Sequence, residues 1–212
     1  MIIKNIENSK IKIKVDPTPH KLQMNGRERH LALGRLLEKD TICSNTNDII
    51  SILSKGYSIL PIISIDNKVM QSLFAIDLLD IKHIPMYINI IFAYEQIGIP
   101  PFAIFKLEND NNLCSYRLLF ATNIPLCNKK DIDKMKAILR AIANKHKTMC
   151  KCPYVIDGIL AKTYSFYGDI RVDAKTALNN YEPSFKKYIL SDSTLSSKFR
   201  YPKNWFKKEI NC

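Results

Sequence analysis

Long apolar runs are absent from this 212-residue sequence. A transmembrane helix needs about 20 consecutive apolar residues, and the longest apolar stretches here are shorter. Met1 to Lys4 run directly into charged sequence, so no signal peptide is expected. We therefore expect a cytoplasmic protein without membrane contact. With 46% hydrophobic residues, the chain is still expected to bury a core and fold.

Cysteines at the spacing of a metal site are also missing. Six cysteines occur, and Cys150 and Cys152 form the only close pair. Structural zinc is bound by four ligands, usually from two such pairs, so a zinc site is not favoured. Scattered cysteines of this kind are typical of a cytosolic protein, and we expect reduced thiols.

Acidic residues are too few to balance the basic ones. There are 20 Asp and Glu residues against 32 Lys and Arg residues, which gives a net charge of +12. A basic surface attracts polyanions, most often nucleic acid. The abundance of Lys, Ile and Asn is also typical of AT-rich coding sequence, so the charge indicates nucleic-acid binding without establishing it.

The order of the predicted elements indicates an α+β fold. Strands are predicted over 70–77, 102–107, 115–121 and 163–167, with helices over 84–97 and after Asn128. This βαββαβ order is that of a ferredoxin-like or RRM-like core, an antiparallel sheet with two helices on one face. The other face would be open to a ligand. The aromatic strand signature of RNA-recognition modules is missing.

Three regions are predicted along the chain. Residues 1–56 form an N-terminal α/β extension packed on the core, with a strand near 11–15, a basic helix from Gly26 and a helix over 47–55. Residues 57–175 form the α+β core, and Pro61 places its first strand at an edge or a bulge. Residues 176–212 form a basic tail with interleaved aromatic residues. Such a tail is typical of base stacking or of an amphipathic helix docked on the core.

Asp77 is the most informative residue of the core. It follows the apolar run Leu73 to Ile76, and a second acid, Asp80, comes three residues later. An ionised carboxylate removed from water needs a cation, a metal or hydrogen bonds. A turn residue just beyond the strand is the simpler interpretation, and a metal ligand is the alternative.

Four segments in order resemble a known family: Gln71 to Asp77, Tyr94 to Pro101, Ser115 to Phe120 and Ser165 to Gly168. They resemble the archaeo-eukaryotic primase-like proteins of Gram-positive plasmids, phages and integrative elements, over about residues 50–170. The resemblance implies a DNA-replication protein with a nucleotidyltransferase site on a modified ferredoxin-like sheet. In that site three acids hold divalent metal, and a Ser-x-His element contacts the nucleotide phosphates.

The resemblance carries over only in part. Asp77 matches the first acid and Asp157 the later acid, so these two are the candidate metal ligands for Mg²⁺ or Mn²⁺. The second acid falls at Leu79, which cannot bind metal, and Asp80 faces the wrong way unless a bulge redirects it. The Ser-x-His element is absent, because the corresponding stretch begins at Lys106 and contains no histidine. The scaffold is retained and the catalytic set is eroded, so at most one weakly bound metal is expected.

Phosphate contacts would then depend on basic side chains. The candidates in the core are Lys106, Arg117 and Lys162, and those in the N-terminal helix are Arg27, Arg29 and Arg35.

Three hypotheses follow for function. The first is a primase-like protein of a mobile element that has reduced or lost primer synthesis and binds single-stranded DNA, primer-template or a replication complex that includes a helicase. The second is an active primer polymerase that uses nucleotides and the acids Asp77, Asp80 and Asp157. The third is a protein-interaction module without catalysis. Salt-dependent DNA binding separates the third from the others, and nucleotide incorporation separates the first two.

Overall fold

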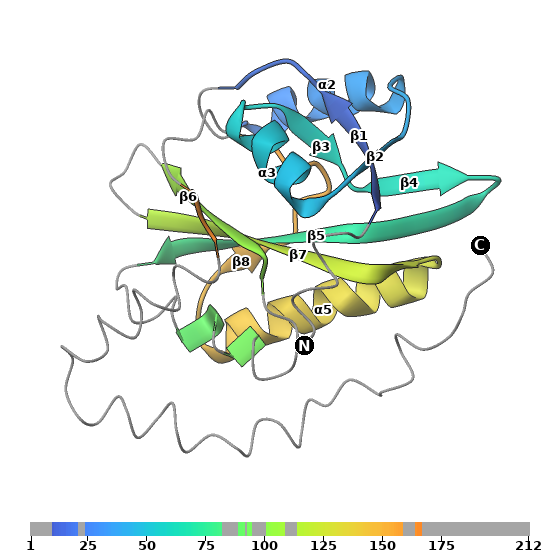
Figure 1. Ribbon diagram of the computed structural model, residues 1–212. Helices are drawn as coiled ribbons and strands as arrows, with labels where there is room; N and C mark the ends of the chain where they lie inside the picture. The colour runs from blue at the N-terminus through green and yellow to red at the C-terminus, as the bar shows by residue number, and fades with distance from the viewer. Residues whose placement is uncertain are drawn as a thin grey trace, which may run out of the picture.

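The structure is a computed structural model that describes residues 10–20, 24–81, 89–91, 93–94, 101–108, 114–158 and 164–166. Helices and antiparallel sheets are mixed in this part of the chain (Figure 1), so the α+β class is confirmed. The predicted tail lies outside the described residues. So does most of the predicted helix over 84–97, of which 89–91 and 93–94 are helical. None of the described helices is long and apolar enough to cross a membrane.

A six-stranded sheet forms the centre of the molecule. Its strands lie in the order β4 (Ile62–Ile65), β5 (Lys68–Ile81), β7 (Cys114–Leu126), β6 (Ala103–Glu108) and β9 (Tyr164–Phe166), with β8 (Cys150–Lys151) also paired to β5. Strand β5 is longer than the predicted 70–77, because the apolar residues Leu78 and Ile81 continue it. Asp77 therefore lies inside a strand and not at its end, which corrects the turn interpretation.

A smaller sheet, in the order β2-β1-β3, forms the N-terminal unit together with two helices. Its elements are β1 (Ile11–Asp16), α2 (Gly26–Leu37), β2 (Ile42–Ser44), α3 (Thr46–Ser54) and β3 (Ser58–Leu60). Capping boxes begin both helices, Asn25 with Glu28 in α2 and Asn45 with Asp48 in α3. This sheet extends past the boundary predicted at residue 56, since β3 pairs with β1.

Pro61 divides the predicted strand over 57–65 between the two sheets. Residues before it pair with β1, and residues after it form the edge strand β4 of the main sheet. Proline has no N–H to donate, so the ladder breaks there. Strand β4 continues into β5 through a tight turn at Asp66 and Asn67, whose φ values of 49° and 62° suit these residue types.

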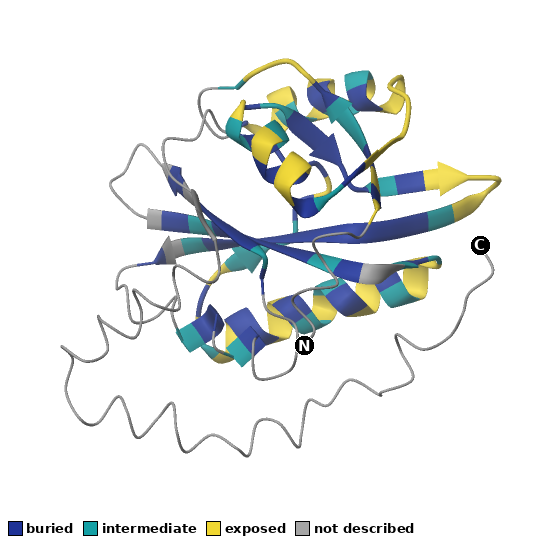
Figure 2. Ribbon diagram, in the orientation of Figure 1, coloured by how far each residue is buried: buried dark blue, intermediate teal, exposed yellow. Residues whose placement is uncertain are grey.

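Both faces of the main sheet are covered. Helix α5 (Lys129–Lys145), capped by Asn128, packs Met135 and Leu139 on one face against Ile76 and Leu118. The N-terminal unit covers the other face, where Ile13, Ile49 and Ile59 join Leu73, Ala75 and Leu119. Figures 1 and 2 show the buried strands of the main sheet between these two layers. The face that the sequence analysis expected to be open is thus closed by the N-terminal unit, and this face carries Asp77.

Candidate functional site

Asp77 and Arg117 lie directly opposite each other on the central strands β5 and β7. The Nε of Arg117 donates to Oδ1 of Asp77 at 2.6 Å, and its Nη2 donates to Oδ2 of Asp77 at 2.9 Å. This two-point contact matches the fork of the guanidinium to the carboxylate. Both side chains are almost fully buried, at 2% and 0% exposure. The register of one β-ladder therefore creates an ion pair in the core.

Asp157 contacts the same guanidinium from the other side. Nη2 of Arg117 donates to Oδ1 of Asp157 at 2.9 Å, and Nη1 donates to the backbone carbonyl of Asp157. Asp157 is held there by its neighbours, because Ile156 bridges to Ile59 and the N–H of Gly158 donates to the carbonyl of Tyr57 at 2.9 Å. The two predicted acids, 80 residues apart in the sequence, thus meet around one cation.

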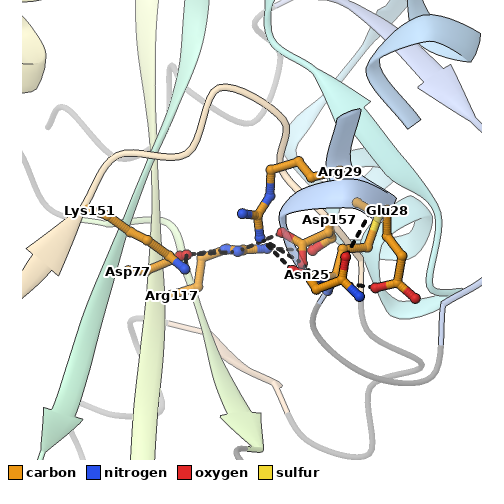
Figure 3. Close-up of polar contacts among 8 residues, drawn as sticks. Asn25, Glu28, Arg29, Asp77, Arg117, Lys151 and Asp157 are labelled. Atoms are coloured by element: carbon orange, nitrogen blue, oxygen red, sulfur yellow. Dashed lines mark hydrogen bonds and ion pairs between the residues drawn. The ribbon is translucent and has the colours of Figure 1, made fainter. Parts of the chain in front are cut away.

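Helix α2 completes the arrangement. The backbone N–H of Met24 donates to Oδ2 of Asp157 at 3.0 Å, and Nη2 of Arg29 lies 3.6 Å from the same oxygen. Arg29 also donates to the carbonyl of Met24, next to the N-cap Asn25. Figure 3 shows Arg29 reaching Asp157 from the helix while Arg117 links Asp157 to Asp77. We call the set Asp77, Arg117, Asp157 and Arg29 the buried ion network.

Opposite charges balance in the network, with two carboxylates and two guanidinium groups. Burial alone would lower the pKa of Arg117, but the carboxylates of Asp77 and Asp157 raise it above its ordinary value. Burial likewise would raise the pKa of Asp157, but Arg117, Arg29 and the Met24 N–H hold it below its usual value. Arg117 and Asp157 are therefore both charged near neutral pH.

A pH-dependent stability follows from the lowered pKa of Asp157. The carboxyl titrates at about 3.9 in an unfolded chain and lower in the folded chain, so the unfolded state binds more protons between these values. The contribution of Asp157 should be complete above about pH 5 and lost as the pH falls below about 4 toward the folded pKa. Urea unfolding at steps between neutral pH and about pH 3 measures it. Asp157→Asn, which removes the titrating group, should flatten this part of the profile, and a wild-type profile already flat there would contradict the assignment.

A metal ion does not fit between Asp77 and Asp157 in this arrangement. All four carboxylate oxygens lie against protein donors: both oxygens of Asp77 face Arg117, and those of Asp157 face Arg117 and Met24 with Arg29. Mg²⁺ needs oxygen ligands in near-octahedral geometry. In the described part of the chain, no group of three or more His, Cys, Asp or Glu side chains could hold a metal. The cation between these acids is the guanidinium of Arg117, where a divalent metal ion or a lysine was expected.

The third acid lies in an irregular part of β5. The pairing of Leu78 with Tyr116 and of Ile81 with Cys114 leaves one extra residue on β5, so a bulge spans Leu79 and Asp80. Asp80 would need such a bulge to face the same side of the sheet as Asp77. The side chain of Asp80 lies outside the described part of the structure.

Two of the three predicted phosphate-binding residues of α2 have internal partners instead. Arg29 contacts Asp157, and Arg35 binds Asp16 through Nε and Nη2, both at 2.8 Å from Oδ2. Asp16 is buried at the end of β1, so this pair ties α2 to the small sheet. Arg27 remains exposed. Arg29 and Arg35 therefore hold the N-terminal unit in place.

The core candidates for phosphate binding divide in the same way. Arg117 is buried in the network, which corrects its prediction as a surface contact for phosphate. Lys106 lies on β6, and its side chain is outside the described part of the structure. The whole of Lys162 is outside it. Lys151, which was not predicted, lies 4.0 Å from Oδ2 of Asp77 with a side chain 41% exposed. Its contact is at the limit of an ion pair and contributes little.

The partner of Asp77 has a signal in the sequence that was not used. Asp77 follows the apolar run Leu73 to Ile76, and Arg117 precedes the apolar run Leu118 to Ala121. A buried charge of either sign needs a partner of the opposite sign. The contribution of Met24 has no such signal, because it comes from a backbone N–H.

The cysteines are mostly free thiols, as expected for Cys43, Cys150 and Cys152. Burial raises the pKa of Cys152 to about 11, so this thiol is a poor nucleophile. Cys127 is disulfide-bonded, which differs from the expectation of reduced thiols.

Comparison of the chain with protein-family models, with curated proteins and with solved structures finds no match in any of the three.

Proposed function

We propose that this chain is a primase-like nucleic-acid-binding protein without primer synthesis. The observation that carries the proposal is the guanidinium of Arg117 between Asp77 and Asp157. The resemblance assigns these two acids to the metal site of the family. Here the guanidinium of Arg117 contacts both acids, and the N-terminal unit covers them.

The chemistry of nucleotide transfer explains why this matters. Two-metal catalysis needs ions about 3.5–4 Å apart that bind both the attacking and the leaving oxygens. Arg117 cannot donate a hydrogen bond to a phosphate from solution, since its side chain is only 2% exposed. Its raised pKa also excludes proton transfer at neutral pH. The network can stabilise the core, but it has no means to activate a hydroxyl group.

The strand order supports a ferredoxin-like origin of the core. Strands β5, β6 and β7 correspond to the first, second and third strands of the predicted βαββαβ core. In the sheet β7 lies between β5 and β6, as a ferredoxin-like order requires. A ferredoxin-like sheet places its last strand beside its first. In this chain the last strand, β9, pairs with β6 instead. The place beside the first strand, β5, is taken by β4 and β8. We propose a modified ferredoxin-like core whose edge beside β5 has been rebuilt.

The partners that suit this function are polyanions. The net charge of +12 favours single-stranded DNA or primer-template in a cytoplasmic replication complex of a mobile element, in which a helicase is a plausible neighbour. Nucleotides would be substrates only of an active enzyme.

Binding and extension assays test the proposal together. We expect the protein to bind a short fluorescent oligothymidylate, with the logarithm of affinity falling linearly with the logarithm of salt concentration, because phosphate contacts release counterions. We expect no extension of a primed template with either Mg²⁺ or Mn²⁺. An active polymerase of the same family is the positive control for extension. Absence of binding at low salt would leave the interaction-module hypothesis, and extension by wild type would establish the active-enzyme hypothesis.

A further inference from the structure

The exposed face of α5 concentrates the positive charge of the described chain. Within α5, from Lys129 to Lys145, there are six basic residues and two acidic ones, a net charge of +4. The basic residues are Lys129, Lys130, Lys134, Lys136, Arg140 and Lys145. One acid, Asp131, accepts from the side chain of the N-cap Asn128. The helix thus carries far more positive charge than its own acids balance.

The amphipathic pattern of α5 directs these charges outward. Ile132, Met135, Leu139 and Ile142 face the core, so Lys130, Arg140 and Lys145 are exposed. None of the ion pairs found in the described residues involves these three side chains. This differs from α2, whose Arg29 and Arg35 are used internally.

Like charges are also held close together on this helix. Burial lowers the pKa of Lys136, and the cation of Arg140 one turn away lowers it further against the opposing effect of Asp133. Like charges at this spacing destabilise a helix. An anion bound along the face would relieve the repulsion.

We propose that the exposed face of α5, from Lys129 to Lys145, binds the phosphate backbone of a nucleic-acid strand. The inference rests on the proposed function and assigns its binding surface. A helix of 17 residues is roughly 25 Å long at 1.5 Å per residue, enough to follow several phosphates of one strand. The surface lies on the face of the main sheet opposite to the N-terminal unit (Figure 1), so it is separate from the buried ion network.

The chemistry of the face favours a nucleic acid over a membrane. A helix that binds a lipid surface buries large apolar side chains between its lysines. On α5 the exposed positions between the basic residues carry Ala137, Ala141 and Asn144. The large exposed hydrophobic residues of the described chain lie elsewhere than on α5. A small, cationic face suits a strand of phosphates that remains at the surface.

Two matched charge variants of the full chain test the proposal. The first is Lys130→Gln, Arg140→Gln and Lys145→Gln on α5. The control is Lys12→Gln, Lys39→Gln and Lys55→Gln, which removes the same charge from exposed positions of the N-terminal unit. Circular dichroism and thermal unfolding verify that both variants fold. Fluorescence anisotropy with the oligothymidylate, at several salt concentrations, measures binding.

We expect the α5 variant to bind on the order of ten- to a hundredfold more weakly at low salt, with a salt slope shallower by about 2, since each lost single-strand phosphate contact removes about 0.7. The control should stay within about threefold of wild type. If wild type binds and the two variants weaken it equally, the placement on α5 is overturned while the proposed function stands. If wild type does not bind at all, the proposed function fails first. If α5 is needed for anionic vesicles and not for the oligonucleotide, the partner is a membrane and the inference is wrong.

Discussion

Arg117→Met is expected to lower the free energy of unfolding by about 3–5 kcal/mol. Methionine fills a similar volume but removes the cation that contacts both Asp77 and Asp157. Arg29 lies 3.6 Å from Asp157, and Lys151 lies 4.0 Å from Asp77 with a side chain 41% exposed, so neither supplies the two-point contact that Arg117 makes. Two carboxylates would face each other in the core, with burial and repulsion both opposing their ionisation. Urea unfolding at neutral pH measures the loss.

A double variant separates the effect of charge from the effect of shape. Asp77→Leu combined with Arg117→Met removes one acid together with the cation and leaves Asp157 with Arg29 and the Met24 N–H. Replacing both members of a buried ion pair costs much less than removing one. We therefore expect the double variant to be more stable than Arg117→Met alone. Equal stability, or a loss of less than about 1 kcal/mol in the single variant, would show that the network contributes little.

Gly158→Ala should destabilise the protein by about 3 kcal/mol, the upper end of the usual range for overpacking. A Cβ at this position would lie 2.3 Å from the carbonyl oxygen of Tyr57, 2.6 Å from that of Leu53 and 2.7 Å from a backbone carbon of Gly56. These are backbone atoms, which cannot rotate away as a side chain can. The strain would also displace the neighbouring Asp157 from Arg117. Thermal and urea unfolding both report the change.

The matched control for Gly158 is Gly34→Ala. Gly34 lies inside α2, and a Cβ there meets nothing within 4 Å. Alanine in a helix interior is favoured over glycine by about 0.5–1 kcal/mol, so this variant should be slightly more stable than wild type. If the two substitutions have the same sign and size, the close approach at Gly158 does not limit stability.

Local signals in the sequence account for several of the element boundaries. Asn45 and Asn128 begin helices, Gly56 follows the end of α3 with a φ of 79°, and Asp66 with Asn67 forms a hairpin turn. Each of these depends on a few neighbouring residues, so no knowledge of the fold is needed. The end of β5 was placed too early, since an acid was taken as a strand terminator and its cross-strand partner was not known.

Only part of the candidate site could be predicted, because the rest depends on contacts between distant parts of the chain. That Asp77 and Asp157 meet was expected from the order of family-like segments, and the contacts with one guanidinium confirm it. The identity of the cation depends on the register between β5 and β7, and the closure of the sheet face depends on the packing of the N-terminal unit. Both are long-range properties, which residue types and local spacing do not determine.

The span of the buried ion network in the chain bears on how the protein folds during synthesis. Met24 and Asp157 are 133 residues apart, and ribosomes add about 5–20 residues per second. Roughly 7–27 s therefore pass between the synthesis of Met24, just before α2, and the synthesis of Asp157, whose carboxylate accepts from the Met24 N–H. Through this interval β3 lacks its bridge from Ile59 to Ile156. A nascent chain released before residue 157 should be protease-sensitive in its N-terminal unit, which makes the first third of the molecule among the last parts to become stable.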